Sequence, residues 1–126
     1  MRYEPLFERF EATAPGGACV SAEFLRAGFL TVGDRPDLYF FRVTPVGPQP
    51  RDSAQSGPEN VAVGVSGDAL KRFQNERRSL SREEKIDLAG LMLKRNIEAG
   101  RCLDSNNLFI RDLELASLAG ELGILG

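Results

Sequence analysis

The segment from Ser81 to Gly100 constrains the fold most, because it predicts a long helix with an unusually broad apolar surface. Ser81-Arg82-Glu83-Glu84 has the pattern of a capping box, and Gly100 is a natural stop, so we expect a helix from about Arg82 to Ala99. One stripe carries Ile86, Ala89, Leu93 and Ile97, and the other side carries Leu88, Leu91 and Met92. Such a helix must be covered on two sides. We expect this helix either to lie between a sheet and another helix or to supply a dimer interface.

Two segments before this helix have strand patterns. Leu38 to Thr44 is dense in aromatic and β-branched residues, and both of its faces are apolar near its start, which predicts a strand inside a sheet. Asn60 to Ser66 alternates, with a branched face of Val61, Val63 and Val65 opposite a face of small side chains. We expect another group to pack closely against Ala62 and Gly64.

A tight turn and a helix follow this second strand. Ser66 is placed to cap a helix whose apolar stripe is Ala69, Leu70 and Phe73. The turn is not a nucleophile elbow, because Asp68 stands where the last glycine of G-x-S-x-G is needed. No P-loop pattern is present either.

The remaining segments complete the expected fold. The spacing of Leu6, Phe7 and Phe10 predicts a short amphipathic helix over residues 5–12. Residues 18–32 fit either a helix or strands, and strands are favoured. Four prolines predict an exposed flexible loop over residues 45–58, with the PxxP pair Pro45 and Pro48 as an alternative ligand for an aromatic groove.

The C-terminal part predicts a turn, a brief strand and a last helix. The strand is expected at 108–111, and Asp112 is placed to cap a helix carrying Leu113, Leu115, Leu118 and Leu122. The whole chain is then expected to be a single α+β domain over residues 1–126. In this fold an antiparallel sheet of about four or five strands packs against the central and C-terminal helices, with a short N-terminal helix.

Composition argues against most enzyme classes. Not one histidine occurs among the 126 residues, and the two cysteines, Cys19 and Cys102, lie far apart. This removes imidazole bases and the commonest transition-metal ligand, so we expect no catalytic residues, no metal and no cofactor. The formal net charge of −2, the charged N-terminus and the lack of a long apolar run predict a cytoplasmic protein that does not enter a membrane.

A basic run between residues 71 and 85 is a candidate site for an anion or an acidic partner. Its cations are Lys71, Arg72, Arg77, Arg78, Arg82 and Lys85. Several of them could converge on a phosphate, which would allow RNA binding. The alternative is a solvated connection between two helices, held by ion pairs of little energetic weight, and this is favoured.

Glu83 and Asp87 form a second candidate, because residues four apart share one helical face. Such a pair could hold Mg²⁺ or act as acid and base. Arg82 and Lys85 flank the two acids, and a solvated face of mixed charge is the expectation.

The function expected from these observations is that of a non-catalytic interaction or adaptor module. It would bind a protein partner or form a homodimer through the central helix, at Leu88, Leu91 and Met92. Anion or RNA binding through the basic run is the alternative. The small size, the mild acidity, the expected N-terminal amphipathic helix and the α+β pattern are also similar to those of acidic secretion chaperones. This resemblance implies chaperone-like binding of a protein client as a third possibility.

Overall fold

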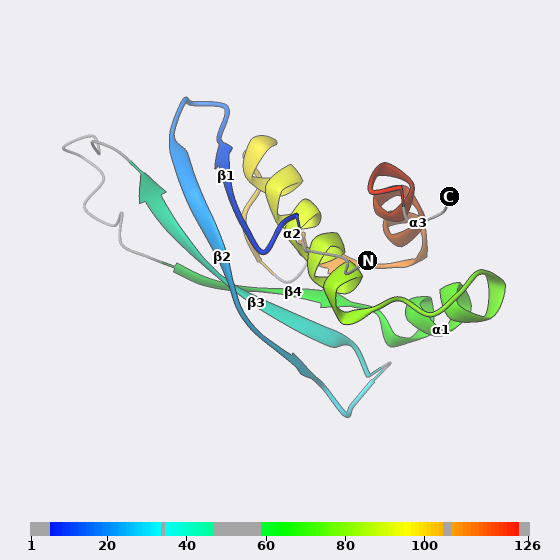
Figure 1. The fold of residues 1–126 in the computed structure, drawn as a ribbon. Helices are drawn as coiled ribbons and strands as arrows, with labels where there is room; N and C mark the ends of the chain where they lie inside the picture. Colours follow the sequence, from blue (N-terminus) through cyan, green and yellow to red (C-terminus); the bar gives the residue numbers. More distant parts are fainter. Residues whose placement is uncertain (1–5, 34, 47–58, 105–106, 124–126) are drawn as a thin grey trace.

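The computed structural model describes residues 6–33, 35–46, 59–104 and 107–123. In these residues five strands and three helices follow one another along the chain (Figure 1). They are β1 (Arg9–Thr13), β2 (Cys19–Phe29), β3 (Asp37–Val46), β4 (Glu59–Val65), α1 (Gly67–Glu76), α2 (Arg82–Glu98), β5 (Phe109–Ile110) and α3 (Asp112–Glu121). The predicted α+β class is confirmed. None of the described helices is both long and apolar enough to cross a membrane.

The five strands form one mixed sheet in the order β1-β2-β3-β4-β5. The first four are antiparallel neighbours, whereas β5 runs parallel to β4. The expectation of a purely antiparallel sheet was therefore wrong at this edge. The chain leaves β4 and passes through α1 and α2 before it returns, and a crossover of this kind brings a strand back in the same direction.

The two strands with the clearest sequence patterns form as predicted. β3 lies between β2 and β4, and its Tyr39, Phe41 and Val43 are buried on the face that contributes to the core. Val61, Val63 and Val65 of β4 are buried on the same face, because the register pairs them with residues of β3. Close packing against Gly64 is also confirmed. A Cβ atom built there would lie 2.8 Å from the Phe109 ring.

The N-terminal helix predicted over residues 5–12 was wrong. Residue 5 lies outside the described residues, residues 6–8 form a bend, and β1 begins at Arg9. A strand forms instead of a helix because the turn at residues 14–17 reverses the chain. In this turn the Gly17 N–H donates to the Ala14 carbonyl at 2.9 Å. This turn sets β1 against β2, and Ala12 is then buried on the core side of the sheet.

The long helix begins and ends where its sequence signals place it. Ser81 accepts a hydrogen bond from the Glu84 backbone N–H, and the Glu84 carboxylate accepts one from the Ser81 N–H, so the capping box is complete. At the other end Gly100 has a φ of +70°, a conformation that glycine adopts without steric cost. The buried residues of α2 share one hydrophobic cluster with those of the sheet and of α3.

Two predictions about connections need adjustment. β3 continues through Val46, so Pro45 belongs to a strand rather than to the predicted loop. The rest of the predicted loop, residues 47–58 with Pro48 of the PxxP pair, lies outside the described residues. Asp112 is the first residue of α3 and not its cap. The N-cap is Arg111, whose guanidinium has no acceptor and makes no side-chain capping bond. The Asp112 carboxylate pairs with Arg72.

Candidate functional site

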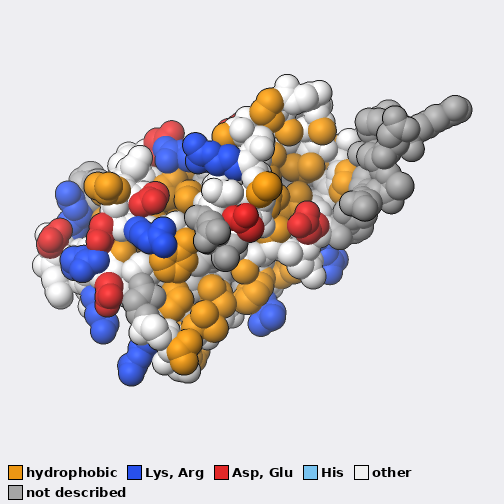
Figure 2. Space-filling model, turned by 180° about the vertical axis from the view of Figure 1, so that it is seen from behind, with side chains coloured by type: hydrophobic (Ala, Val, Ile, Leu, Met, Phe, Trp, Pro, Cys, Tyr) orange, Lys and Arg blue, Asp and Glu red, His pale blue; other side chains and the backbone are white. Residues whose placement is uncertain are grey.

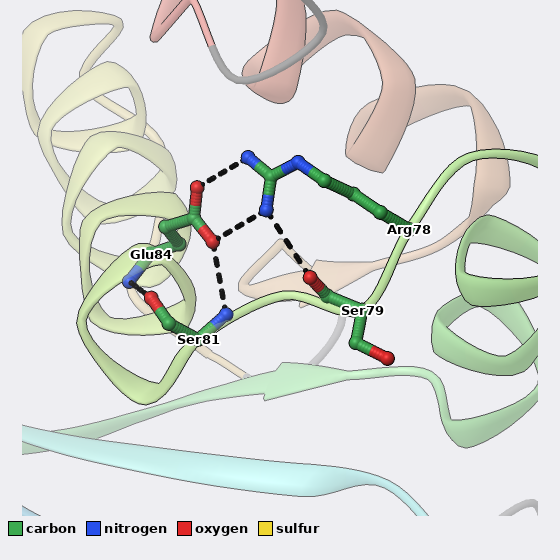
Figure 3. A network of polar contacts seen from close by, with 4 residues as sticks. All are labelled: Arg78, Ser79, Ser81 and Glu84. Atoms are coloured by element: carbon green, nitrogen blue, oxygen red, sulfur yellow. Dashed lines mark hydrogen bonds and ion pairs between the residues drawn. The ribbon is translucent and has the colours of Figure 1, made fainter.

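Arg78 of the basic run is held by a carboxylate of α2. Its guanidinium donates two hydrogen bonds to Glu84, at 2.9 and 2.6 Å, and a third to the Ser79 carbonyl (Figure 3). These bonds from Arg78, followed by the bond from the Ser81 N–H, lower the pKa of Glu84 to about 2. The Glu84 side chain raises the pKa of Arg78 in turn. Arg78 therefore serves to tie the α1–α2 connection to the start of α2.

Other cations of the basic run are directed to different elements. Arg72 forms an ion pair with Asp112 of α3, and Lys85 lies 3.6 Å from the Asp37 carboxylate of β3. The Arg82 guanidinium lies 5.6 Å from the centre of the Phe24 ring of β2. These contacts pull the side chains toward α3, β3 and β2, so they do not meet around one anion.

The two remaining cations of the run lie on α1 and at its C-cap. Lys71 and Arg77 are exposed, and no ion pair with either is recorded among the described residues. Arg77 lines a shallow groove between α1 and α3 in which Glu76 and Asp112 also lie. Carboxylates in the same groove oppose the binding of a phosphate.

The apolar face of α2 that was expected to form an interface is largely buried within the chain itself. Leu88 is fully buried, Leu91 is 9% exposed, and Met92 is half-buried. The N-terminal segment covers part of α2, because a Cβ atom at Gly90 would collide with the Phe7 Cβ and lie 2.7 Å from the Phe7 carbonyl oxygen. One chain therefore supplies both covers that the helix requires, and dimerisation is not needed to enclose Leu88 and Leu91.

Glu83 and Asp87 were expected to share a solvated face, and this expectation was wrong for Asp87. It is fully buried, and its carboxylate accepts a hydrogen bond of 2.8 Å from the Phe7 backbone N–H. Asp87 lies three residues before Gly90, so both are on one face of the helix, and a glycine there lets another backbone segment approach closely. This is the signal that the sequence analysis missed. Asp87 positions the N-terminal segment, and the structure does not use it as a paired acid with Glu83.

In the described part of the chain, exposed apolar side chains cluster elsewhere, on the hairpin formed by the end of β2 and the start of β3. We call residues 25–33 and 35–40 the β2–β3 arm. Within it, the exposed fractions of Phe29, Leu30 and Val32 are 71%, 44% and 68%. The arm projects past the helices (Figure 1), and hydrophobic side chains gather along it when the molecule is seen from behind (Figure 2).

The open face of the sheet carries a second apolar surface. Leu38 and Phe40 of β3 point away from the buried Tyr39 side and are half-buried. Leu38 and Phe109 both pack at Gly64, which joins the arm to β5. We call Leu38, Phe40 and Phe109 the open-face patch.

Arginines surround the open-face patch. The Arg26 guanidinium lies 4.3 Å from the centre of the Phe40 ring, and Arg111 lies 4.8 Å from that of Phe109. Arg42 is exposed one rung further along the same face of β3, opposite Glu23, whose carboxylate pairs with Arg9 at 2.9 Å. A chain with a net charge of −2 thus presents a basic rim on this face.

The described residues contain no group of three or more acidic or cysteine side chains that could hold a metal ion. Comparison with known proteins finds no family model, no curated protein sequence and no solved structure that matches the chain. Function is therefore inferred from the residues and their geometry.

Proposed function

We propose that this chain is a non-catalytic protein-interaction module that binds its partner through the β2–β3 arm and the open-face patch. The observation that carries the proposal is the exposure of Phe29 and Val32, at 71% and 68%, on a projecting hairpin. Large apolar side chains grouped on a surface mark interaction sites far more often than isolated ones do. Phe29 lies opposite Asp37, on the Tyr39 face of the hairpin, and the half-buried patch lies on the other face of the same two strands.

The rim defines the chemistry of the partner. Arg26 and Arg111 already lie over aromatic rings, so their guanidinium groups are positioned and lose little freedom on binding. Planar guanidinium groups form paired hydrogen bonds with carboxylates. The partner surface we infer carries apolar side chains with acidic residues at its margin.

The proposed class of function is the one expected from the sequence, but the binding surface is a different one. The central helix was the first candidate, at Leu88, Leu91 and Met92, but the first two side chains contribute to the core of the chain itself. Among the described residues, α2 carries no exposed large apolar side chain, whereas the arm carries several. Four of its side chains are exposed, namely Leu25, Phe29, Leu30 and Val32.

A pull-down from the native lysate tests the proposal when the arm is varied. The double variant Phe29→Ser/Val32→Ser removes apolar area without adding charge. The control is Leu113→Ser on α3, which is 85% exposed and lies outside the arm. The tagged proteins are compared with and without nuclease, at low and high salt, and captured proteins are identified by mass spectrometry.

We expect a protein that is captured by the wild type and by Leu113→Ser, survives nuclease and high salt, and is lost with the arm variant. A partner retained equally by the arm variant contradicts the proposed surface. Capture that disappears with nuclease or salt contradicts the proposed class and favours RNA binding through the basic run, since phosphate contacts weaken steeply with salt.

A further inference from the structure

A β-bulge in β2 places two phenylalanines on one side of the arm. The pairing of β2 with β3 shifts by one residue just after Phe24, which leaves Leu25 as the additional residue. Phe24 lies opposite Phe41 and Phe29 lies opposite Asp37. Phe41 and Asp37 share a face of β3, because they are an even number of residues apart. In a regular strand, residues five positions apart lie on opposite faces. The bulge therefore brings Phe24 and Phe29 to the same side.

This side of the arm and of its base continues the core side of the sheet, and we call it the helix-side face. It carries Phe24, Ala27 and Phe29 of β2 with Asp37 and Tyr39 of β3. α2 begins at Arg82, whose guanidinium lies 5.6 Å from the centre of the Phe24 ring. Further out, Ala27 is exposed although it lies opposite the buried Tyr39, and Phe29 is 71% exposed. In the described chain, the layer of helices that covers the rest of this side therefore stops at the base of the arm.

The inner end of the helix-side face carries an unbalanced positive charge. The Asp37 carboxylate lies 3.6 Å from the Lys85 ammonium group, so these two charges offset each other. Arg82 is exposed, and no ion pair with it is recorded among the described residues. The neighbouring acid, Glu83, is turned about 100° round the helix. An apolar surface therefore ends at one exposed guanidinium group.

We propose that the helix-side face binds an acidic amphipathic helix of a partner protein. The apolar side of this helix packs on Ala27 and Phe29, and one of its carboxylates pairs with Arg82. The inference rests on the proposed function, because it names the class of partner segment and the side of the arm that the segment occupies. The Arg82 guanidinium already lies over the Phe24 ring, so it pairs with a carboxylate without being ordered anew.

The dimensions of the helix-side face fit a helix. Phe41 and Asp37, which lie opposite the two phenylalanines, are four residues apart in β3, a distance of about 13 Å along the strand. A helix of about nine residues has this length, since it rises about 1.5 Å per residue. Two neighbouring strands, about 4.8 Å apart, present a surface about as wide as one helix with its side chains, about 10 Å.

Two other occupants are disfavoured. A strand that paired with the outer side of β2 would meet the bulge at Leu25, where the alternation of backbone groups is broken. A second copy of this chain, bound through the same face, would bring a second Arg82, and a like charge does not neutralise the first. An acidic segment supplies the charge that the site lacks, and a helix supplies its apolar side chains on one face.

Binding of synthetic peptides to the full chain tests the proposal. The probe is an amphipathic peptide of about 15 residues, long enough to form a helix, with leucines on one face and glutamates on the other. One control peptide carries lysines in place of the glutamates. The other control is the acidic peptide with two central prolines, which break the helix. Each peptide carries a fluorescent label, and anisotropy measures its dissociation constant.

We expect the acidic helical peptide to bind more tightly than both control peptides. Arg82→Glu should weaken its binding about three- to tenfold, and Phe29→Ser about tenfold. Arg26→Glu is the matched control, since Arg26 lies opposite Phe40 on the other side of the same arm, and it should leave the dissociation constant unchanged. A glutamate is favourable in the first turn of a helix, so Arg82→Glu should fold, and circular dichroism checks this. If it does not fold, Phe29→Ser decides.

No saturable binding of the acidic helical peptide, or equal binding of either control peptide, would overturn the acidic helix. So would a loss of binding in Arg26→Glu but not in Arg82→Glu, because it would place the peptide on the open-face patch. A wild-type dimer in light scattering that Phe29→Ser converts to a monomer would assign the face to a second copy instead. The proposed function is decided separately, by whether the Phe29→Ser/Val32→Ser variant loses a captured partner.

Discussion

Replacing Glu84 by Gln tests the ion pair between α2 and the preceding connection. The Glu84 side chain is 10% exposed and accepts bonds from Arg78 at 2.9 and 2.6 Å and from the Ser81 N–H at 2.9 Å. Glutamine also serves in a capping box, so the Ser81 bond can be retained. The substitution therefore removes the charge that faces Arg78 and leaves the helix start otherwise intact.

The magnitude follows from the pKa of Glu84. Arg78, and then the capping bond, lower this pKa from 4.5 to about 2 in the folded protein. At about 1.4 kcal/mol for each pKa unit, the carboxylate stabilises the fold by at most about 3 kcal/mol. Because the Arg78 side chain is 48% exposed and solvent weakens the pair, we expect about 1–2 kcal/mol. Since the folded pKa is depressed, this contribution is complete above pH 4.5 and falls as the pH drops toward 2.

Urea denaturation at several pH values between 7 and 3 measures the effect. Glu84→Gln should lower the free energy of unfolding by about 1–2 kcal/mol at pH 7, and less than half of the difference should remain at about pH 3. Glu83→Gln is the matched control, since Glu83 lies in the same helical turn and no ion pair with it is recorded among the described residues. An equal loss in both variants, or a loss for Glu84→Gln that does not change with pH, would refute the assigned role of Arg78.

Four further substitutions, at three positions, test the packing, each by urea denaturation at pH 7. Asp87→Ala leaves the Phe7 N–H without its buried acceptor and should cost about 1–3 kcal/mol. Asp87→Asn, which keeps an oxygen acceptor, should cost less. Gly90→Ala should cost about 1–3 kcal/mol despite its better helix propensity, because the new Cβ would lie 2.7 Å from the Phe7 carbonyl oxygen. Gly64→Ala should cost less than Gly90→Ala, since it meets a Phe109 ring that can rotate rather than a backbone atom.

The elements predicted correctly are those whose signals are local. The capping box of α2, the Ser66 cap of α1 and the alternation of β4 each involve residues within one or two turns or within one strand, and the structure reproduces them. β1 shows the limit of such signals. Phe7 and Phe10 have helical spacing, and the strand forms because β2 provides a partner for it. Pairing between strands is a tertiary interaction that overrides a local pattern.

The candidate site shows the same limit more strongly. The bond between Asp87 and Phe7 joins residues 80 positions apart, and the pair between Arg72 and Asp112 joins residues 40 apart. No local pattern distinguishes a cation that binds a ligand from one that ties two helices together. The exposed arm had a local signal, the turn at residues 33–36 between two apolar runs, but its lack of cover is a property of the three-dimensional arrangement.

Near the arm, the core side of the sheet ends in polar contacts around Asp37. The Tyr39 hydroxyl donates to the Asp37 carboxylate at 3.4 Å, and Lys85 approaches the same carboxylate from α2. Burial, and then the charge of Asp37, raises the pKa of Tyr39, so this hydroxyl stays protonated and remains a donor. A sheet whose core ends in polar contacts needs no apolar residues beyond them. Phe29 lies opposite Asp37 at this boundary, Val32 lies beyond it, and both are nevertheless apolar and exposed. Since they add little to the fold of one chain, binding to a second surface is the function that their exposure supports.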